Sequence, residues 1–230
     1  INGLVNEIVI VDMGSKDKTL EIARKSGAKI LKHKLVPYVE LVRNWGLEKA
    51  KGEWILVLDP DERLPETLLF KLKGIVQEGK FEAVSIPRKN IIFGKWIRHT
   101  NWWPDYQVRF FKKGRVSWSR KIHRYPEVKG EILKLPAQEE LAIEHLNYDS
   151  VSQFLERQNR YSEISAQNRF EEGERFSWKN FSWKPTRVFL QRYIRHAGFL
   201  DGFYGLALSF LAFYSQLSEE VKLWEKTKLK

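Results

Sequence analysis

The feature that most constrains the fold is an alternation of short apolar runs with helical patterns in the N-terminal part of the chain. Residues 8–11 form a continuous β-branched run, as expected for a strand covered on both faces. Residues 28–31 and 54–58 are the next strand candidates, with helical patterns between them and after Pro65. This alternation predicts an α/β fold with a mostly parallel sheet flanked by helices.

The pattern changes in the second half of the chain. Short strand-like pieces and many tryptophans come first, and a long helical pattern follows over residues 154–170. The polar and aromatic stretch 171–184 is typical of a connector, and a further apolar segment runs to the end of the chain. We therefore expect an α/β catalytic domain over residues 1–150 and a helical C-terminal region over residues 151–230.

The charge and the absence of cysteine limit the classes of partner and site. The chain has no cysteine, which excludes disulfides and thiolate metal sites and is compatible with a reducing cytoplasm. The formal net charge of +11 suits anionic partners such as nucleotide diphosphates, nucleic acid or an acidic membrane surface. The alternative is that the charge only keeps the protein soluble. No RNA-binding motif is present in the sequence, so nucleic acid is not an expected partner.

The aspartates have an uneven distribution. Four of them follow two predicted strands: Asp12, Asp17, Asp59 and Asp61. In an open α/β sheet, ligands bind at the carboxyl ends of the strands, and aspartate is a hard oxygen ligand that suits Mg²⁺ or Mn²⁺. Pro60 fixes the backbone between two of these carboxylates, so the pair can hold a cation that neutralises a diphosphate. The alternative is a helix-capping turn before Pro65.

Several segments are similar to one known family in the same order and spacing. The segment VDMGSKDKT at 11–19 resembles the VDxGSxDxT motif of the family 2 glycosyltransferases, which have the GT-A fold. RNWG at 43–46 and GEWILVLDPDE at 52–62 are similar to the next two landmarks. WWPDYQVRFF at 102–111 and HLNY at 145–148 resemble a subgroup that includes lipopolysaccharide-core β-glucosyltransferases. The resemblance covers nearly the whole chain.

The resemblance implies an activity and a set of site residues. These enzymes transfer a sugar from a nucleotide diphosphate sugar, here by resemblance UDP-linked, with inversion and with a carboxylate as general base. A lipid-linked or cell-envelope glycan would be the acceptor. The expected donor-binding residues are Asp12, Ser15, Asp17, Arg43, Asn44 and Asp59. The expected ligands of Mg²⁺ or Mn²⁺ are Asp59, Asp61 and His123.

Two departures from the family pattern affect these expectations. The chain opens just before what would be the second strand, so the first strand and helix of the family are expected to be missing. The subgroup carries His-Glu where this chain has His123-Arg124, and arginine cannot act as a base. Asp105 is therefore the first choice for the general base and Glu127 the second. The alternative is an inactive relic, or a non-enzymatic module that binds nucleotide sugars or membranes.

Aromatic residues and arginines raise two further expectations. Trp102, Trp103 and Arg109 are expected to contact the acceptor, whereas Trp118 is expected in the core. The apolar stretch 203–217 is shorter than the roughly 20 residues that span a bilayer. Mixed arginines and apolar residues at 187–196 suit a helix in an anionic membrane interface, which predicts a cytoplasmic protein held peripherally on the inner face of the cell membrane. The alternative is a hairpin packed on the catalytic domain, or a dimer contact.

Overall fold

The computed structural model describes residues 5–119 and 125–228. The chain forms two compact units. Unit 1 comprises Ile1–Asp59, Glu66–Ile86 and Gln107–Pro136, and unit 2 comprises Pro60–Pro65, Pro87–Tyr106 and Ala137–Lys230. The units do not coincide with a boundary at residue 150, because segments on the N-terminal side of it pack with the helices. The division into domains 1–150 and 151–230 stays a prediction.

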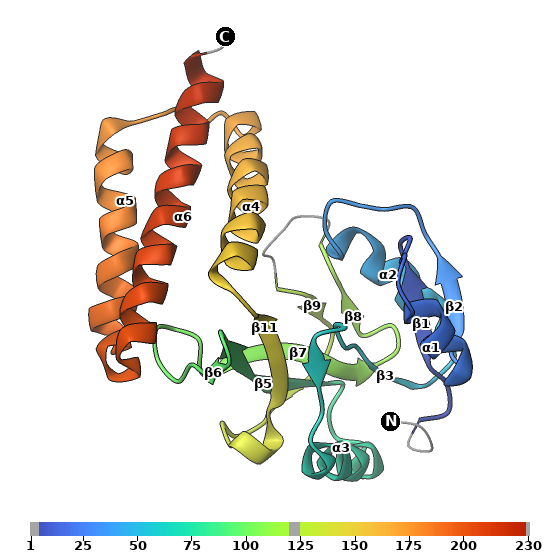
Figure 1. Ribbon diagram of the computed structural model, residues 1–230. Coiled ribbons are helices and arrows are strands. Elements are labelled where there is room, and N and C mark those ends of the chain that lie inside the picture. The colour runs from blue at the N-terminus through green and yellow to red at the C-terminus, as the bar shows by residue number, and fades with distance from the viewer. Residues whose placement is uncertain (1–4, 120–124, 229–230) are drawn as a thin grey trace. The chain divides into compact units, whose positions relative to one another are not determined.

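Unit 1 begins with the expected alternation of strands and helices (Figure 1). Its first elements are β1 (Val9–Asp12), α1 (Thr19–Lys25), β2 (Lys29–Lys32) and α2 (Glu40–Lys49). β1 and β2 pair in parallel, as the β-branched run predicts. Helix α1 ends before Gly27, whose φ of +69° is the left-handed conformation that commonly terminates a helix. The helix begins at Thr19, several residues after Ser15.

The rest of unit 1 adds antiparallel and parallel strand pairs. Its further elements are β3 (Trp54–Leu56), α3 (Glu66–Glu78), β8 (Val116–Ser117), β9 (Glu127–Val128) and β10 (Ile132–Lys134), with parts of β5 (Ala83–Ile92) and β7 (Asp105–Lys112). β3 pairs with β7 antiparallel, and β10 pairs with β5 in parallel. Ala83, Phe111, Val116 and Trp118 form one buried cluster, which confirms the expected core position of Trp118.

Unit 2 contains the remaining sheet strands. They are β4 (Glu62–Arg63), β6 (Lys95–Trp96) and β11 (Ile143–Tyr148), and the short helix η1 (Glu139–Leu141) precedes β11. β11 pairs in parallel with the later half of β5 and antiparallel with β4. The α/β class is confirmed, with more antiparallel pairing than the sequence indicated. The extra antiparallel pairs come from short strands and hairpins, which lack crossover helices.

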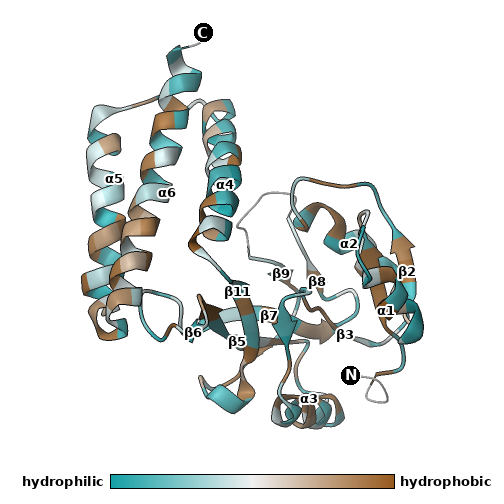
Figure 2. Cartoon of the chain, in the orientation of Figure 1, coloured by the Kyte–Doolittle hydropathy of each residue, from teal (hydrophilic) through white to brown (hydrophobic). Residues whose placement is uncertain are grey.

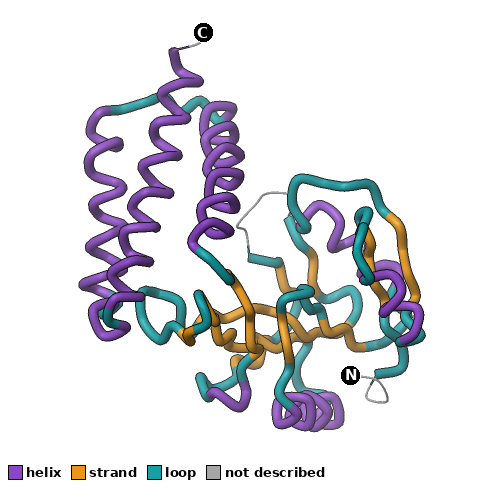
Figure 3. The backbone as a smooth tube through the Cα atoms, in the orientation of Figure 1, coloured by secondary structure: helices purple, strands orange, loops and turns teal. Residues whose placement is uncertain are grey.

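Unit 2 ends in a layer of helices, drawn purple in Figure 3. They are α4 (Val151–Glu171), α5 (Trp178–Leu190), the π-helical η2 (Gln191–Arg195), η3 (Gly198–Asp201) and α6 (Phe203–Lys228). Helix α6 packs against both α4 and α5. The expected connector at 171–184 is shorter than predicted, because α5 already begins at Trp178. Within the described ranges, no helix is long and apolar enough to cross a membrane.

Candidate active site

Asp12 closes the turn that follows β1. Its Oδ1 accepts the Ser15 N–H at 3.0 Å and its Oδ2 accepts the Gly14 N–H at 3.3 Å. Gly14 has a φ of +101°, a conformation that favours glycine. Hydrogen bonds from the Ser15 side chain and then its backbone hold the pKa of Asp12 below its usual range. The turn therefore carries an ionised carboxylate at the carboxyl end of a strand, where donor contacts were predicted.

Asp17 lies in the same loop as Asp12 but bonds to the start of α1. Its Oδ1 accepts the Thr19 N–H at 3.0 Å, at the first residue of α1. Hydrogen bonding by the Thr19 side chain and then its backbone lowers the pKa of Asp17. Asp17 thus lies one residue before the N-cap position, Lys18, and pairs with the first N–H of the helix.

Asp59 is held by two arginines in unit 1. Arg43 Nη2 lies 2.8 Å from Asp59 Oδ1 and 3.1 Å from Oδ2, and Arg109 Nη2 lies 2.5 Å from Oδ2. The β3–β7 pairing produces this contact, since the Val57 N–H donates to the Arg109 carbonyl at 2.8 Å. Arg43 and Asp59, both predicted to contact the donor, therefore lie together. Arg109, expected at the acceptor, is buried against Asp59 instead, with 4% of its surface exposed.

Asn44 has a structural role in this unit. Its Nδ2 donates to the Trp118 carbonyl at 2.8 Å, and its Oδ1 accepts the Trp118 N–H at 2.9 Å. The Asn44 side chain thus pairs with both backbone groups of Trp118, as a neighbouring β-strand would. Because both halves of the amide are engaged, the predicted donor contact of Asn44 is not what the geometry favours. The neighbouring Arg43 guanidinium lies over the Trp118 ring, 5.6 Å from its centroid.

Asp105 is the centre of a polar network in unit 2. Arg88 donates to Asp105 Oδ2 from Nε at 2.8 Å and from Nη2 at 2.6 Å, and Asn90 Nδ2 donates to the same oxygen at 3.1 Å. Arg88 Nη1 also lies 3.1 Å from Oε1 of Glu62, whose side chain is fully buried. The predicted base is therefore a carboxylate held in one orientation by three donors.

The same network reaches Asp61 through His145. His145 Nδ1 lies 2.7 Å from Asn90 Oδ1, and its Nε2 lies 3.5 Å from Asp61 Oδ2. Arg157 Nη1 is 4.0 Å from that oxygen. Two positions that follow the second predicted strand thus belong to one polar network. Asp61 joins it by its 3.5 Å contact with His145, and Glu62 joins it through Arg88. This network was not foreseen.

The sequence interpretation missed Arg88, Asn90 and Glu62. A signal for the first two existed, because both are polar residues within the apolar pattern of β5 and, two positions apart, share one face of the strand. Their polarity at a face that is otherwise buried predicts a polar partner, since buried polar groups are hydrogen-bonded. No comparable pattern marked Glu62.

Neither Asp59 nor Asp61, the expected metal ligands that the structure describes, has surroundings that favour a cation. The carboxylate of Asp59 is neutralised by two guanidinium groups, next to which a divalent cation is repelled. Asp61 lies between His145 and Arg157. In the ranges 5–119 and 125–228, no group of three or more His, Asp or Glu side chains is placed to hold a metal ion. His123 falls outside the described residues.

Of the remaining predicted residues, Trp102 joins the Asp105 network through its backbone, since Asn90 Nδ2 also donates to the Trp102 carbonyl at 3.0 Å. Trp102 packs on the core of unit 2, with the Arg192 guanidinium 5.5 Å from its ring centroid, and its contact with the acceptor stays a prediction. Trp103 contacts Trp96 edge to face, with ring centroids 5.2 Å apart. Glu127 is exposed on β9, opposite Ser117.

Fold and site together define an α/β domain with ionisable residues at the carboxyl ends of its strands. The Glycosyl transferase family 2 model matches residues 2–128, more than half of the chain, and the chain belongs to this family. Family membership accounts for the motif at 11–19 and for the acidic residues after β3.

Individual relatives differ in how much of their length matches. The lipopolysaccharide core biosynthesis glycosyltransferase LpsC of Rhizobium meliloti is 25% identical over 219 residues, which is 89% of this chain and 80% of the relative. A TPR repeat-containing protein of Synechococcus elongatus is 43% identical over 91 residues, which is 40% of this chain but only 23% of that protein. Among solved structures, S. aureus TarS in complex with UDP matches with a TM-score of 0.45 and 15% identity over 97% of this chain and 82% of that one.

Proposed function

We propose that this protein is an inverting glycosyltransferase that moves a hexose from a nucleotide diphosphate sugar, UDP-linked by resemblance, to a glycan acceptor. The observation that carries the proposal is the ionised Asp12 at the end of β1 together with Asp59 and its two arginines after β3, within a chain that belongs to family 2. Both positions lie at carboxyl ends of strands, where α/β folds bind nucleotides.

The proposed roles follow from the chemistry of each group. Arg43 and Arg109 are suited to the diphosphate, because a guanidinium matches phosphate oxygens and is always charged. Asp105 is the proposed general base. It takes the proton of the acceptor hydroxyl as that oxygen bonds to the anomeric carbon, and the nucleotide diphosphate leaves with the electrons of the broken bond.

The acceptor proposed is a lipid-linked or cell-envelope glycan, and the proposed location is the cytoplasmic face of the cell membrane. The relative LpsC, which is named for lipopolysaccharide core biosynthesis, supports the first of these. Dependence on Mg²⁺ or Mn²⁺ is proposed on the family resemblance alone, and the reaction described above contains no metal-dependent step.

A thermal-shift screen tests the proposal. A ligand that binds only the folded protein at 100 times its Kd stabilises it by about 2.7 kcal/mol, so a UDP-sugar should raise the melting temperature measurably. The screen compares UDP-, GDP- and CMP-sugars, each with MnCl₂ and with EDTA. A shift that needs both UDP-sugar and manganese supports the metal-dependent form, and a shift in EDTA supports donor binding without metal. No shift with any nucleotide would favour the inactive relic.

A further inference from the structure

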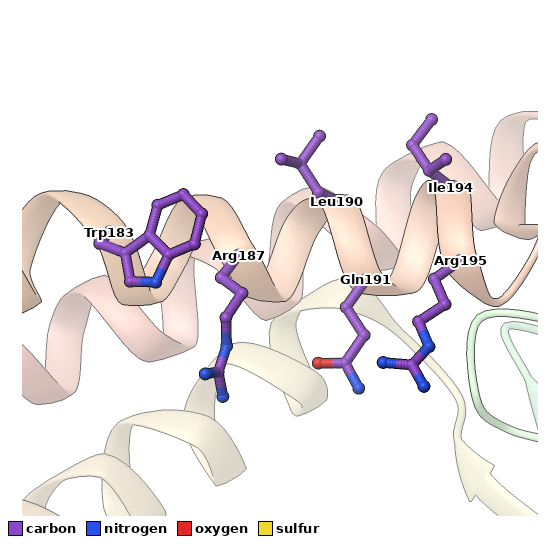
Figure 4. A pocket seen from close by; sticks show the side chains of 6 residues that line it. All are labelled: Trp183, Arg187, Leu190, Gln191, Ile194 and Arg195. Carbon is purple, nitrogen blue, oxygen red and sulfur yellow. The ribbon is translucent and has the colours of Figure 1, made fainter.

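One face of α5 and η2 carries large exposed apolar side chains beside arginines. Trp183, Leu190 and Ile194 have exposed fractions of 54%, 45% and 58%. Their spacing of seven and four residues places them near one side of the helix, and Figure 4 shows Leu190 and Ile194 pointing the same way. Arg187 and Arg195, with a glutamine between them, point to the other side in that view, and all six residues line an open groove of about 600 Å³.

The turn that joins η2 to α6 continues this apolar surface. Phe199, Leu200 and Phe203 are 50%, 62% and 80% exposed. Figure 2 shows that the hydrophobic colour is concentrated at this end of α5 and α6, whereas the opposite ends are more polar. Apolar side chains scattered singly on a surface need no explanation, but a group of this kind marks an interaction site.

The backbone of the turn is fixed although these side chains face outward. Asp201, in the middle of the turn, is buried and accepts the His99 N–H at 2.8 Å, and it also lies 3.0 Å from His99 Nδ1. Gly205 lies so close to the turn that a Cβ added to it would be 1.8 Å from the Gly198 carbonyl oxygen. The exposed residues therefore lie on an anchored loop, so binding does not incur the conformational entropy cost of ordering that loop.

The charge of the segment from residue 177 to residue 203 indicates which kind of partner it binds. The cations from residue 177 to 203 are Lys179, Lys184, Arg187, Arg192 and Arg195. The one acid in that stretch of sequence is Asp201, which is 5% exposed and anchors the turn. The exposed part of the segment is therefore apolar and positive. A second copy of the same face would bring arginine against arginine, which disfavours a symmetric dimer.

We propose that the hairpin face, defined as Trp183, Arg187, Leu190, Ile194, Arg195, Phe199, Leu200 and Phe203, docks on an anionic lipid bilayer. The apolar side chains enter the boundary of the acyl chains, and Arg187 and Arg195 bind phosphate groups of the lipids. Docking in the plane of the interface agrees with the finding that none of the described helices is long and apolar enough to span a membrane. The inference deepens the proposed peripheral location but does not depend on the donor site.

Vesicle co-sedimentation tests the proposal with the whole chain. The vesicles are phosphatidylcholine alone, or phosphatidylcholine with an equal part of phosphatidylglycerol, at low and high NaCl. The variants are Leu200→Ser/Phe203→Ser and Arg187→Ala/Arg195→Ala. Matched controls in unit 1 are Phe70→Ser, which removes another exposed aromatic residue, and Lys71→Ala/Lys73→Ala, which removes two exposed charges from α3. Circular dichroism melting verifies that each variant is folded.

The expected result is binding to the phosphatidylglycerol vesicles that weakens with salt. The arginine variant should bind about tenfold to thirtyfold more weakly. The apolar variant should also lose binding, and both controls should bind like wild type. Equal binding by all variants, or no binding of wild type at low salt, would overturn the proposal. So would a dimer that Leu200→Ser/Phe203→Ser dissociates in light scattering. UDP-sugar binding measured without vesicles separates this failure from a failure of the donor site.

Discussion

Arg88 binds Asp105 through two nitrogens that converge on one oxygen, with Nε at 2.8 Å and Nη2 at 2.6 Å from Oδ2. On its other side, Arg88 Nη1 is 3.1 Å from the buried carboxylate of Glu62. The guanidinium is thus held between two carboxylates, and the orientation of Asp105 follows from that of Arg88. This relationship explains how a residue at the start of β7 can be held in place for a chemical role.

Asp105→Asn should abolish transfer while donor binding stays nearly intact. The amide has a similar shape but cannot accept a proton from the acceptor, and general base catalysis contributes about 10²–10⁴-fold to rate. Turnover is measured as UDP release with the acceptor, and donor affinity by calorimetry. Wild-type turnover in this variant would remove Asp105 from the role of base.

Arg88→Met should lower kcat more than it raises the KM of the donor, because Arg88 positions Asp105 and is not proposed to contact the donor. Arg88→Lys keeps the charge but has one nitrogen in place of the converging pair, so it should recover only part of the rate. The exposed neighbour Arg63→Met serves as the control. Equal losses in kcat for the methionine and control variants would contradict a positioning role, and full activity of Arg88→Met would also do so.

Asn44→Ala separates a structural role from a donor-binding role. The substitution leaves the buried N–H and carbonyl of Trp118 without the side chain that pairs with them in the structure. Each such buried group costs about 1–3 kcal/mol, so the free energy of unfolding should fall by about 2–6 kcal/mol. Urea denaturation measures it, and the exposed Asn6→Ala should leave it unchanged. If stability is retained while UDP affinity drops sharply, Asn44 is a donor ligand as the family resemblance implied.

The strands and helices near the N-terminus were predictable because each carries a strong local pattern. β1 is a run of consecutive β-branched residues, and the apolar residues of α3 recur at helical spacing, so both patterns can be recognised within one short segment. Leu68, Leu72 and Ile75 are buried, as the apolar face of α3 predicts. The start of α1 was harder to predict from the sequence. Ser15 is a good capping residue by type, but the Asp12 carboxylate accepts its N–H, and the helix begins at Thr19 instead.

The polar contacts were predictable only in part, because they join residues that are distant in sequence. The motif at 11–19 located Asp12, and its hydrogen bonds are local. The partners of Asp59 depend on which residue of β7 lies opposite Val57, and no local pattern states that register. For this reason Arg109 was assigned to the acceptor although it pairs with Asp59.

The stability of the Asp12 turn should depend on pH in a defined direction. Because the folded-state pKa of Asp12 is lowered, its stabilising contribution is present above the unfolded-state pKa of about 3.9 and is lost as pH falls through the lower folded-state value. Ser15→Ala removes the largest cause of the shift, so the pKa of Asp12 should rise toward its usual range. NMR titration of the carboxyl carbon measures this pKa, and Ser26→Ala is the control. An unchanged Asp12 pKa in Ser15→Ala would contradict the assignment.

Asp59→Asn distinguishes two roles of Asp59: pairing with Arg43 and Arg109, here called the arginine clamp, and binding a metal ion. Removing the carboxylate breaks the ion pairs of Asp59 with Arg43 and the buried Arg109. Breaking a buried ion pair costs about 3–5 kcal/mol, and the lower end applies here because Asp59 is partly exposed. If the clamp is the whole function of Asp59, UDP-sugar binding should weaken equally in MnCl₂ and in EDTA. If Asp59 also holds a cation, wild type should bind more tightly in MnCl₂ and the variant should lose that difference. Calorimetry in the two buffers measures both affinities, and chemical denaturation verifies the loss of stability. A variant as stable as wild type would show that the two arginines do not need this carboxylate, and the clamp would then have no structural role.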